Sequence, residues 1–170
     1  MLTQPPLATK KSDMELQNNY MNTAFDEAFR SVRDNIGGPF GAVVILDGRV
    51  IGKGGNMVSS QNDPTAHAEI VAIRNACTHI GSFDLTGAVL YATCEPCPMC
   101  LAAIYWANIR FVYYASTRHQ AEAIGFKDNH IYEEIGLPVS ERRIAFRQVD
   151  HPKAIELFRE WTEKNDKIHY

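Results

Sequence analysis

Two short segments, each at the start of a predicted helix, place the strongest constraint on how this chain folds. The first, TAHAE, carries His67 and Glu69, and the second, EPCPMC, carries Cys97 and Cys100. Both segments follow loop signals. Because the two cysteines are three residues apart, the first turn of a helix that starts at Pro98 places both sulfur atoms on one side. A fold that uses both segments has to bring these two helix starts together.

The residue types in the two segments indicate one zinc site. At the start of a helix, free N–H groups and the positive end of the dipole favour thiolate, which is the form that zinc binds. A borderline-soft ion accepts imidazole and thiolate together, so His67, Cys97 and Cys100 supply three protein ligands. The fourth tetrahedral position is then left to water or hydroxide. We therefore expect one zinc ion per subunit, with a position open for chemistry.

Glu69 is the candidate for proton transfer. Zinc lowers the pKa of bound water toward 7, so a carboxylate beside it can take a proton and later return it to a leaving group. On a regular helix, side chains two residues apart point roughly 200° away from each other. We therefore predict that His67 lies where the backbone is still entering the helix, and that the longer Glu69 side chain reaches back toward the metal.

Cys94 leaves a non-catalytic alternative open. With Cys97 and Cys100 it forms C-x-x-C-x-x-C, and the three cysteines with His67 make up the ligand set of a closed structural zinc site. Cys94 ends a predicted strand, whereas the other two cysteines lie on the following helix, so we expect its thiol to point elsewhere. Cys77 stands apart and is interpreted as a core residue.

Length, charge and hydropathy limit what else the chain can be. Its 170 residues with 45% hydrophobic content are enough for one domain with a sizeable core. A formal charge of -3 creates no overall field for a polyanion and gives nucleic-acid binding no support. No run of 18 apolar residues and no signal-peptide pattern is present. We therefore expect a cytoplasmic protein without membrane association, in which cysteines stay reduced.

The first third of the chain predicts a helix followed by a hairpin. Residues 1–13 are polar and contain two prolines, which predicts a disordered N-terminal tail before a domain over 14–170. Apolar residues at helical spacing predict a helix over 14–35. The hairpin over 40–54 is indicated by Asp47-Gly48, a type I′ turn signal between two apolar runs.

Beyond the hairpin, helices and strands alternate. Asp63 and Pro64 supply an N-cap and a first-turn proline for a helix that begins near Thr65. The stretch 98–107 is apolar on every side, as expected of an interior helix. The other predicted elements are strands at 88–93 and 110–115, a short strand at 145–149 and a helix at 152–164. This order predicts an α/β fold in which helices cover both faces of a mixed central sheet.

The pattern H-x-E followed by P-C-x-x-C is the signature of zinc-dependent nucleobase deaminases, in which the glutamate is not a metal ligand. Over 14–170 the chain resembles the bacterial type of guanine deaminase within the cytidine deaminase superfamily. The resemblance rests on the segments GGPFGAVV, NDPTAHAEI, CEPCPMCLAAIYWA and IGFKDNHIYEEI and on the aromatic residue that ends the chain. It implies a three-layer α/β/α fold and hydrolysis of the 2-amino group of guanine to xanthine and ammonia.

The resemblance also implies which residues would touch the purine. These are Phe40, Asn56, Ala68, Trp106, Asp128 and Tyr170. Asp128 would act beside Glu69 by accepting hydrogen bonds from the ring N–H and the amino group of guanine. A buried carboxylate suits this pair of adjacent donors. Tyr170 would come from the partner subunit, because the family exchanges its C-terminal segment, about 150–170 here, within a homodimer.

Some features of the sequence keep other interpretations open. Lys127 stands where a second acidic residue is expected, and Ala102 stands where a glycine is expected. On pattern alone, Phe40 and Trp106 are typical of core residues, and Asn56 is typical of a turn. The alternatives are a tRNA adenosine deaminase, a guanosine or cytosine deaminase, and a non-catalytic zinc module.

Overall fold

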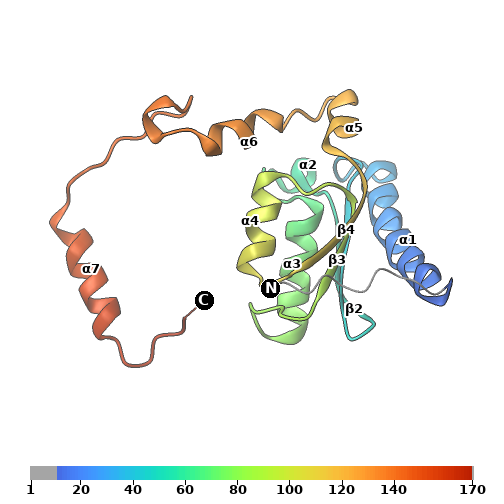
Figure 1. The fold of residues 1–170 in the computed structure, drawn as a ribbon, viewed down its shortest axis with the longest axis horizontal. Helices are drawn as coiled ribbons and strands as arrows, with labels where there is room; N and C mark the ends of the chain where they lie inside the picture. Colours follow the sequence, from blue (N-terminus) through green and yellow to red (C-terminus); the bar gives the residue numbers. More distant parts are fainter. Residues whose placement is uncertain (1–10, 170) are drawn as a thin grey trace. The chain divides into compact units, whose positions relative to one another are not determined.

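A four-stranded mixed sheet is the centre of the N-terminal part of the molecule. The computed structural model describes residues 11–169, and the chain divides after Asp128 into two compact units. In the first unit the strand order is β2-β1-β3-β4, with β3 and β4 parallel and the other pairs antiparallel (Figure 1). The strands are β1 (Gly41–Leu46), β2 (Arg49–Gly55), β3 (Val89–Cys94) and β4 (Phe111–Ser116). The predicted mixed sheet is confirmed.

The predicted hairpin joins β1 to β2. Asp47 and Gly48 have φ angles of 50° and 75°, so both lie in the left-handed region that a type I′ turn requires. Leu46 pairs with Arg49 directly across this turn. The two turn residues therefore set the register next to the turn, and the register shifts by one residue between Ile45 and Val44.

Helices cover both faces of the sheet and give the three-layer α/β/α fold that was expected (Figure 1). One face is covered by α1 (Lys11–Arg33), and the other is covered by α3 (Ala68–Ile80) and α4 (Pro98–Trp106). Alternate residues of β1 point to the two faces: Val43 packs on the α1 side and Val44 on the α3 side.

Close approach of α1 to the sheet depends on glycine. A Cβ atom on Gly41 would lie 2.0 Å from the carbonyl oxygen of Ala24.

Helix α1 begins at Lys11, so residues 11–13 belong to the helix and not to the predicted tail. The rest of that tail, 1–10, lies outside the described residues.

The start of α3 differs from the prediction. The N-cap is His67, with φ -68° and ψ 156°, and Asp63 is not the cap. Asp63 Oδ1 instead accepts hydrogen bonds from the backbone N–H and the hydroxyl of Thr65 at 2.8 and 2.7 Å. The capping group is thus used in a turn. A short helix that was not predicted, α2 (Val58–Gln61), precedes it, and four residues are too few to give a periodic signal.

Helix α4 is less buried than its apolar sequence predicted. Cys100 and Ile104 face the core, whereas Tyr105 and Trp106 are 73% and 66% exposed. The prediction of an interior helix is therefore wrong for the single chain. A sequence that is apolar all round gives no indication of which face lies against the sheet.

The remaining elements follow β4. Helix α5 (Arg118–Ala123) begins with a capping box between Thr117 and Gln120. The second unit contains α6 (Asn129–Gly136), a 3₁₀ turn (Val139–Glu141) and α7 (Pro152–Glu163), which confirms the last predicted helix. The predicted strand at 145–149 is wrong, because these residues form no ladder with any described strand. Among residues 11–169, no helix combines the length and apolarity needed to cross a membrane.

Candidate metal centre

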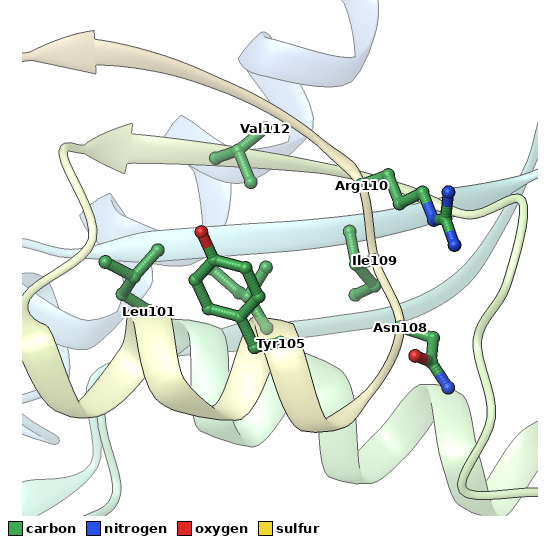
Figure 2. Close-up of a pocket in the computed structure, with 7 residues that line it drawn as sticks. Leu101, Tyr105, Asn108, Ile109, Arg110 and Val112 are labelled. Carbon is green, nitrogen blue, oxygen red and sulfur yellow. The ribbon is translucent and has the colours of Figure 1, made fainter. Parts of the chain in front are cut away.

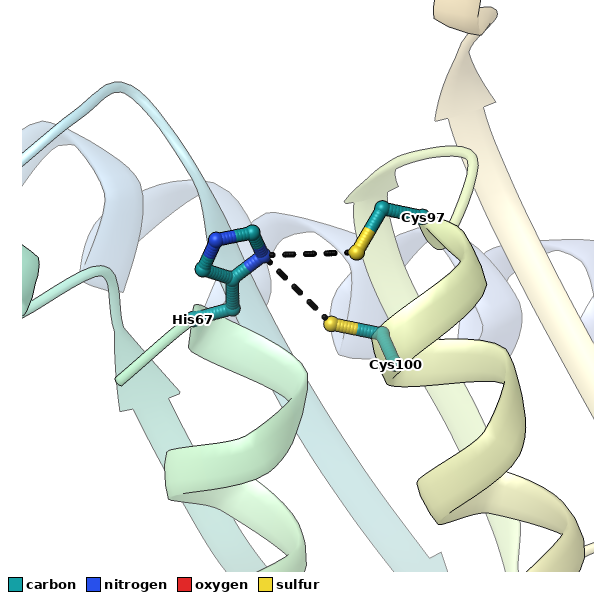
Figure 3. A group of neighbouring side chains, drawn as sticks. All are labelled: His67, Cys97 and Cys100. Atoms are coloured by element: carbon teal, nitrogen blue, oxygen red, sulfur yellow. Dashed lines mark hydrogen bonds between the residues drawn. The ribbon is translucent and has the colours of Figure 1, made fainter. Parts of the chain in front are cut away.

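The three predicted ligands face one another where α3 and α4 begin (Figure 3). His67 Nδ1 lies 3.5 Å from Cys97 Sγ and 3.6 Å from Cys100 Sγ. The three ligand atoms all lie within 4.8 Å of one another. Usual zinc bond lengths in a tetrahedron place nitrogen and sulfur about 3.6 Å apart. The distances therefore fit one zinc ion held by His67, Cys97 and Cys100.

Two of the three ligands, His67 and Cys97, lie directly before a helix. His67 is the N-cap of α3 and Cys97 is the N-cap of α4, and both have extended backbone angles. Glu69 is the second residue of α3. Because His67 does not have helical angles, the 200° separation of a regular helix does not apply to it and Glu69. This confirms that His67 lies where the backbone enters the helix.

The protonation of the two thiols also suits a cation. A hydrogen bond from Cys100 lowers the pKa of Cys97 to about 4, although burial opposes the shift. The same bond, together with burial, raises the pKa of Cys100. One thiolate thus suppresses ionisation of the other, and a bound cation allows both to be thiolates. The donor chemistry agrees with the distances.

Glu69 is a buried carboxyl group, 7% exposed, beside the ligand cluster. Burial raises its pKa to about 7, the charge of Cys97 acts in the same direction, and interaction with the Cys100 thiol lowers it. A group that titrates near neutral pH is suited both to accept and to donate a proton.

Cys94 takes no part in the cluster. Its thiol donates a hydrogen bond to the carbonyl oxygen of Thr117 at 3.7 Å, and burial raises its pKa to about 11. Within the described part of the chain, the His and Cys side chains that gather at ligand distance are those of His67, Cys97 and Cys100. The closed four-ligand site is therefore not formed. Cys77 packs partly against the core, as predicted.

Asn56 is buried at the end of β2 and has a defined orientation. Its Oδ1 accepts hydrogen bonds from the backbone N–H groups of Gly38 at 3.1 Å and Val58 at 3.2 Å. Because Oδ1 is engaged twice, the side-chain NH₂ is the group suited to donate to a ligand. Phe40, directly before β1, is half-buried and packs against the core.

The structure brings the carboxylate of Asp128 into electrostatic range of the ligands. Burial raises its pKa, the charges of Cys97 and Glu95 raise it further, and the charge of Arg118 lowers it. The pKa of His67 is raised mainly by its hydrogen bond with Cys97, and the charge of Asp128 contributes to the same shift.

Two residues near this site were not predicted. Glu95 Oε2 accepts a hydrogen bond from the backbone N–H of Arg118 at 3.1 Å, which ties the thiol loop to the start of α5. The ring of Phe126 packs edge to face on Phe40. Glu95 stands beside Cys97 in the motif, so its position was a usable signal. The contact of Phe126 spans most of the unit and has no local signal.

The other predicted contacts lie in different places. Ala68 is the buried first residue of α3, so its backbone N–H is at the helix start. Trp106 is exposed at the far end of α4, six residues or about 9 Å along the helix from Cys100. Tyr170 lies outside the described residues. The two departures, Lys127 and Ala102, are both exposed.

Cavities of two sizes lie beside the sheet in the described part of the chain. The smaller one, about 120 Å³, is lined by Phe25, Phe40, Thr93 and Cys94 among others. The larger one, about 420 Å³, lies between α4 and β4 (Figure 2). Its lining residues are Leu101, Ile104, Tyr105, Asn108, Ile109, Arg110 and Val112. No imidazole, thiol or carboxylate lines this larger cavity, so it lacks the groups that metal-dependent hydrolysis requires.

Comparison with known proteins gives a consistent picture. Residues 14–116 match the family described as "Cytidine and deoxycytidylate deaminase zinc-binding region". Guanine deaminase of Bacillus subtilis is 46% identical over 151 residues, which are 89% of this chain and 97% of that protein. The tRNA-specific adenosine deaminase of Agrobacterium fabrum is 47% identical over 111 residues, covering 65% of this chain and 72% of that protein.

Solved structures agree with the sequence comparison. The X-ray structure of guanine deaminase from Bacillus subtilis has a TM-score of 0.87 at 45% identity and covers 90% of this chain and 98% of that one. A structure of guanine deaminase from Nitrosomonas europaea has a TM-score of 0.62 at 27% identity, with 74% and 69% covered.

Proposed function

The chain belongs to the zinc-binding family of cytidine and deoxycytidylate deaminases, and from this premise we propose that it hydrolyses guanine to xanthine and ammonia. The observation that carries the proposal is the geometry of the metal centre: three ligands at zinc distances, with buried Glu69 beside them. An open fourth position next to a titratable carboxyl is typical of hydrolytic zinc enzymes rather than of structural zinc sites.

The choice of guanine is supported by how far the likeness extends. The chain spans 97% of a guanine deaminase but 72% of a tRNA-specific adenosine deaminase of similar identity. The net charge of -3 offers no general attraction for the RNA backbone. Asp128, beyond the zinc-binding region, adds a carboxylate that can accept from the adjacent N–H groups of guanine.

In this proposal Glu69 transfers the protons while water replaces the 2-amino group on a ring carbon of guanine. Zinc, when bound, supplies a Lewis acid that makes water a competent nucleophile near neutral pH. Glu69 takes one proton from the attacking water and passes it to a ring nitrogen as the C–O bond forms. Glu69 then takes the second proton from the newly added hydroxyl and gives it to the amine, and the C–N bond to the 2-amino group breaks. Guanine and water thereby give xanthine and ammonia.

Four residues would hold the purine for this step. Asp128 accepts from the ring N–H and the 2-amino group. The NH₂ of Asn56 donates to an acceptor atom of the base, because its Oδ1 is held by two backbone N–H groups. Phe40 lies against one face of the ring. The backbone N–H of Ala68, at the start of α3, donates to the purine carbonyl oxygen.

A homodimer would complete the site. Residues 14–170 form one deaminase domain in this proposal, with the segment at about 150–170 exchanged so that Tyr170 closes the partner's pocket. The exposed apolar side chains on α7, such as Ile155 and Phe158 at 78% and 72%, support a partner for this helix. Exposed Trp106 on α4 would be covered in the same assembly and would line the purine there. Analytical ultracentrifugation should find a dimer, and a monomer at micromolar concentration would contradict it.

We also propose that the enzyme works in the cytoplasm, where Cys97 and Cys100 remain reduced and available to zinc.

The substrate is tested by a panel. Protein with its zinc quantified is given guanine, guanosine, adenosine, cytosine and a tRNA, and ammonia release is followed. We expect prompt turnover of guanine alone. Turnover of guanosine would show that the pocket admits a ribose, and salt-dependent turnover of tRNA would favour the tRNA adenosine deaminase alternative. Either result in place of guanine turnover would contradict the proposal.

A further inference from the structure

We infer that Phe126 is a positioning residue for the purine, because its ring packs against Phe40 and against the turn that orients Asn56. The inference rests on the proposed function, in which Phe40, Asn56 and Asp128 contact the substrate. Phe126 precedes Asp128 by two residues. The ring thus contacts Phe40 and lies against Gly38, whose N–H binds Asn56, and it is close in sequence to Asp128.

The contact with Phe40 is an edge-to-face pair. The two ring centroids are 4.6 Å apart and the ring planes are inclined by 82°. Aromatic rings prefer this arrangement, which places the positive edge of one ring against the negative face of the other. Phe40 is half-buried and packs on the core. Contact with Phe126 therefore restricts the remaining freedom of the Phe40 ring.

The second contact is with the backbone of Gly38. A Cβ atom on Gly38 would lie 3.1 Å from Cζ of Phe126 and 3.4 Å from Cδ2 of Phe40, so both rings lie against this residue. The N–H of Gly38 donates to Oδ1 of Asn56 at 3.1 Å. Phe126 thus supports the same turn that sets the orientation of the Asn56 amide.

The backbone directly after α5 positions Phe126 beside Phe40 and Gly38. Gly125 has φ 103°, a left-handed conformation that favours glycine, and the N–H of Phe126 donates to the carbonyl oxygen of Ala121 at 3.1 Å. The start of α5 is itself tied to the thiol loop by the hydrogen bond from Arg118 N–H to Glu95. The position of Phe126 is therefore coupled to that of the metal ligands.

The exposed fraction of the Phe126 side chain allows its effect on turnover to be distinguished from an effect on stability. Phe126 is 40% exposed, although its ring contacts two residues of the site. Phe83, in the loop after α3, is similarly exposed at 48% and lies at the opposite end of that helix from His67. Replacing either ring should cost little stability, and only Phe126 should affect turnover. Phe83 is thus a matched control.

The test compares zinc-loaded Phe126→Leu, Phe126→Tyr and Phe83→Leu in steady-state turnover of guanine, with zinc content and melting temperature measured for each. We expect Phe126→Leu to lose about tenfold in kcat/KM, mainly in kcat, because substrate still binds but is less well oriented. Phe126→Tyr keeps the aromatic ring but adds a hydroxyl at Cζ, the atom that lies against Gly38, so its kcat/KM should fall between those of wild type and Phe126→Leu. Phe83→Leu should be unchanged.

Two further variants test whether Phe126 acts through Phe40. In a double-mutant cycle, the effects of Phe126→Leu and Phe40→Leu should be less than additive, because part of the effect of Phe126 passes through Phe40. Gly38→Ala should also lower kcat/KM several-fold, because the added Cβ atom displaces the Phe126 ring from its contact with the Phe40 ring. Gly38→Ala changes neither ring, so it keeps the test valid if Phe126→Leu folds poorly.

Two kinds of failure can be told apart. If wild type releases ammonia from guanine while Phe126→Leu has unchanged kcat/KM, the positioning role is wrong and the proposed function stands. Equal losses in Phe126→Leu and Phe83→Leu, or additive effects with Phe40→Leu, would also overturn the role. If zinc-loaded wild type releases no ammonia from guanine, the proposed function itself fails and the inference fails with it.

Discussion

Single residues at the two helix starts determine what the metal centre can do. His67 and Cys97 are N-cap residues with extended backbone, so their side chains meet before either helix begins. Glu69 is the second residue of α3 and is buried beside the three metal ligands. Burial raises its pKa to about 7, which is where a group that both takes and returns a proton is most effective.

Replacing Glu69 tests the proton-transfer role directly. Glu69→Gln keeps the shape and burial of the side chain but removes the titratable group. We expect ammonia release from guanine to fall about 10³-fold while zinc content stays at one per chain. The matched control is Glu15→Gln on the exposed surface of α1, which should leave the rate unchanged. A Glu69→Gln rate within tenfold of wild type would remove Glu69 from this role.

Asp128 should determine the preference for guanine. Asp128→Asn loses the charge that accepts from two adjacent N–H groups and offers an NH₂ in place of one acceptor. Loss of hydrogen bonds to a charged group costs about 1.5–3 kcal/mol, which corresponds to a fall in kcat/KM of roughly 10- to 150-fold. Kinetics on guanine, with the exposed Asp26→Asn on α1 as control, measure this loss. Unchanged kcat/KM would exclude Asp128 from the pocket.

Among the elements, α1 is joined to β2 by a buried carboxylate. Glu27, 5% exposed, accepts from Lys53 Nζ at 2.8 Å and from Arg30. Burial alone raises the pKa of Glu27, but the hydrogen bonds from Lys53 and Arg30 outweigh it and hold the pKa below its ordinary 4.5. The two ion pairs of Glu27 therefore stabilise the fold at pH values above 4.5. This stability is lost as the pH falls through the pKa of Glu27 in the folded state.

The prediction concerns the pH dependence of stability. Glu27→Gln should lower the free energy of unfolding by about 1–2 kcal/mol at pH 7. The difference from wild type should close as the pH falls from 4.5 through the lower pKa of the folded state, because the wild-type carboxyl becomes protonated over this range. Urea unfolding at several pH values measures this difference, with Glu15→Gln as the exposed control on the same helix. A difference that is the same at every pH would show that charge is not the cause.

Elements were predictable from the sequence where local chemistry decided them. Asp47-Gly48 specified the hairpin, because few residues adopt the two positive φ angles of its turn. The start of α3 was misplaced, since Asp63 is a good cap and only the folded chain shows that Thr65 occupies its oxygen. The exposure of α4 was not predictable from an all-apolar run. The zinc ligands were predictable from spacing, whereas Phe126 reaches the site only through tertiary packing.

At the scale of the whole molecule, zinc should contribute to stability. The ligands come from two helix starts that are separate in the sequence, so the folded chain binds the ion far better than the unfolded chain. With free zinc at 100 times its Kd, binding adds about 2.7 kcal/mol to the free energy of unfolding. Removing zinc with a chelator should therefore lower the melting temperature by about 5–10 °C. Re-addition of zinc should restore it, and an unchanged melting temperature would contradict the site.

The central claim is that the metal centre and Glu69 together hydrolyse guanine. The most direct measurement is the stoichiometry of products when protein with one zinc per chain is incubated with guanine. Xanthine and ammonia are quantified in the same samples over time. The proposed mechanism predicts one xanthine and one ammonia for each guanine consumed over many turnovers. No release of ammonia from guanine by fully zinc-loaded protein would contradict it.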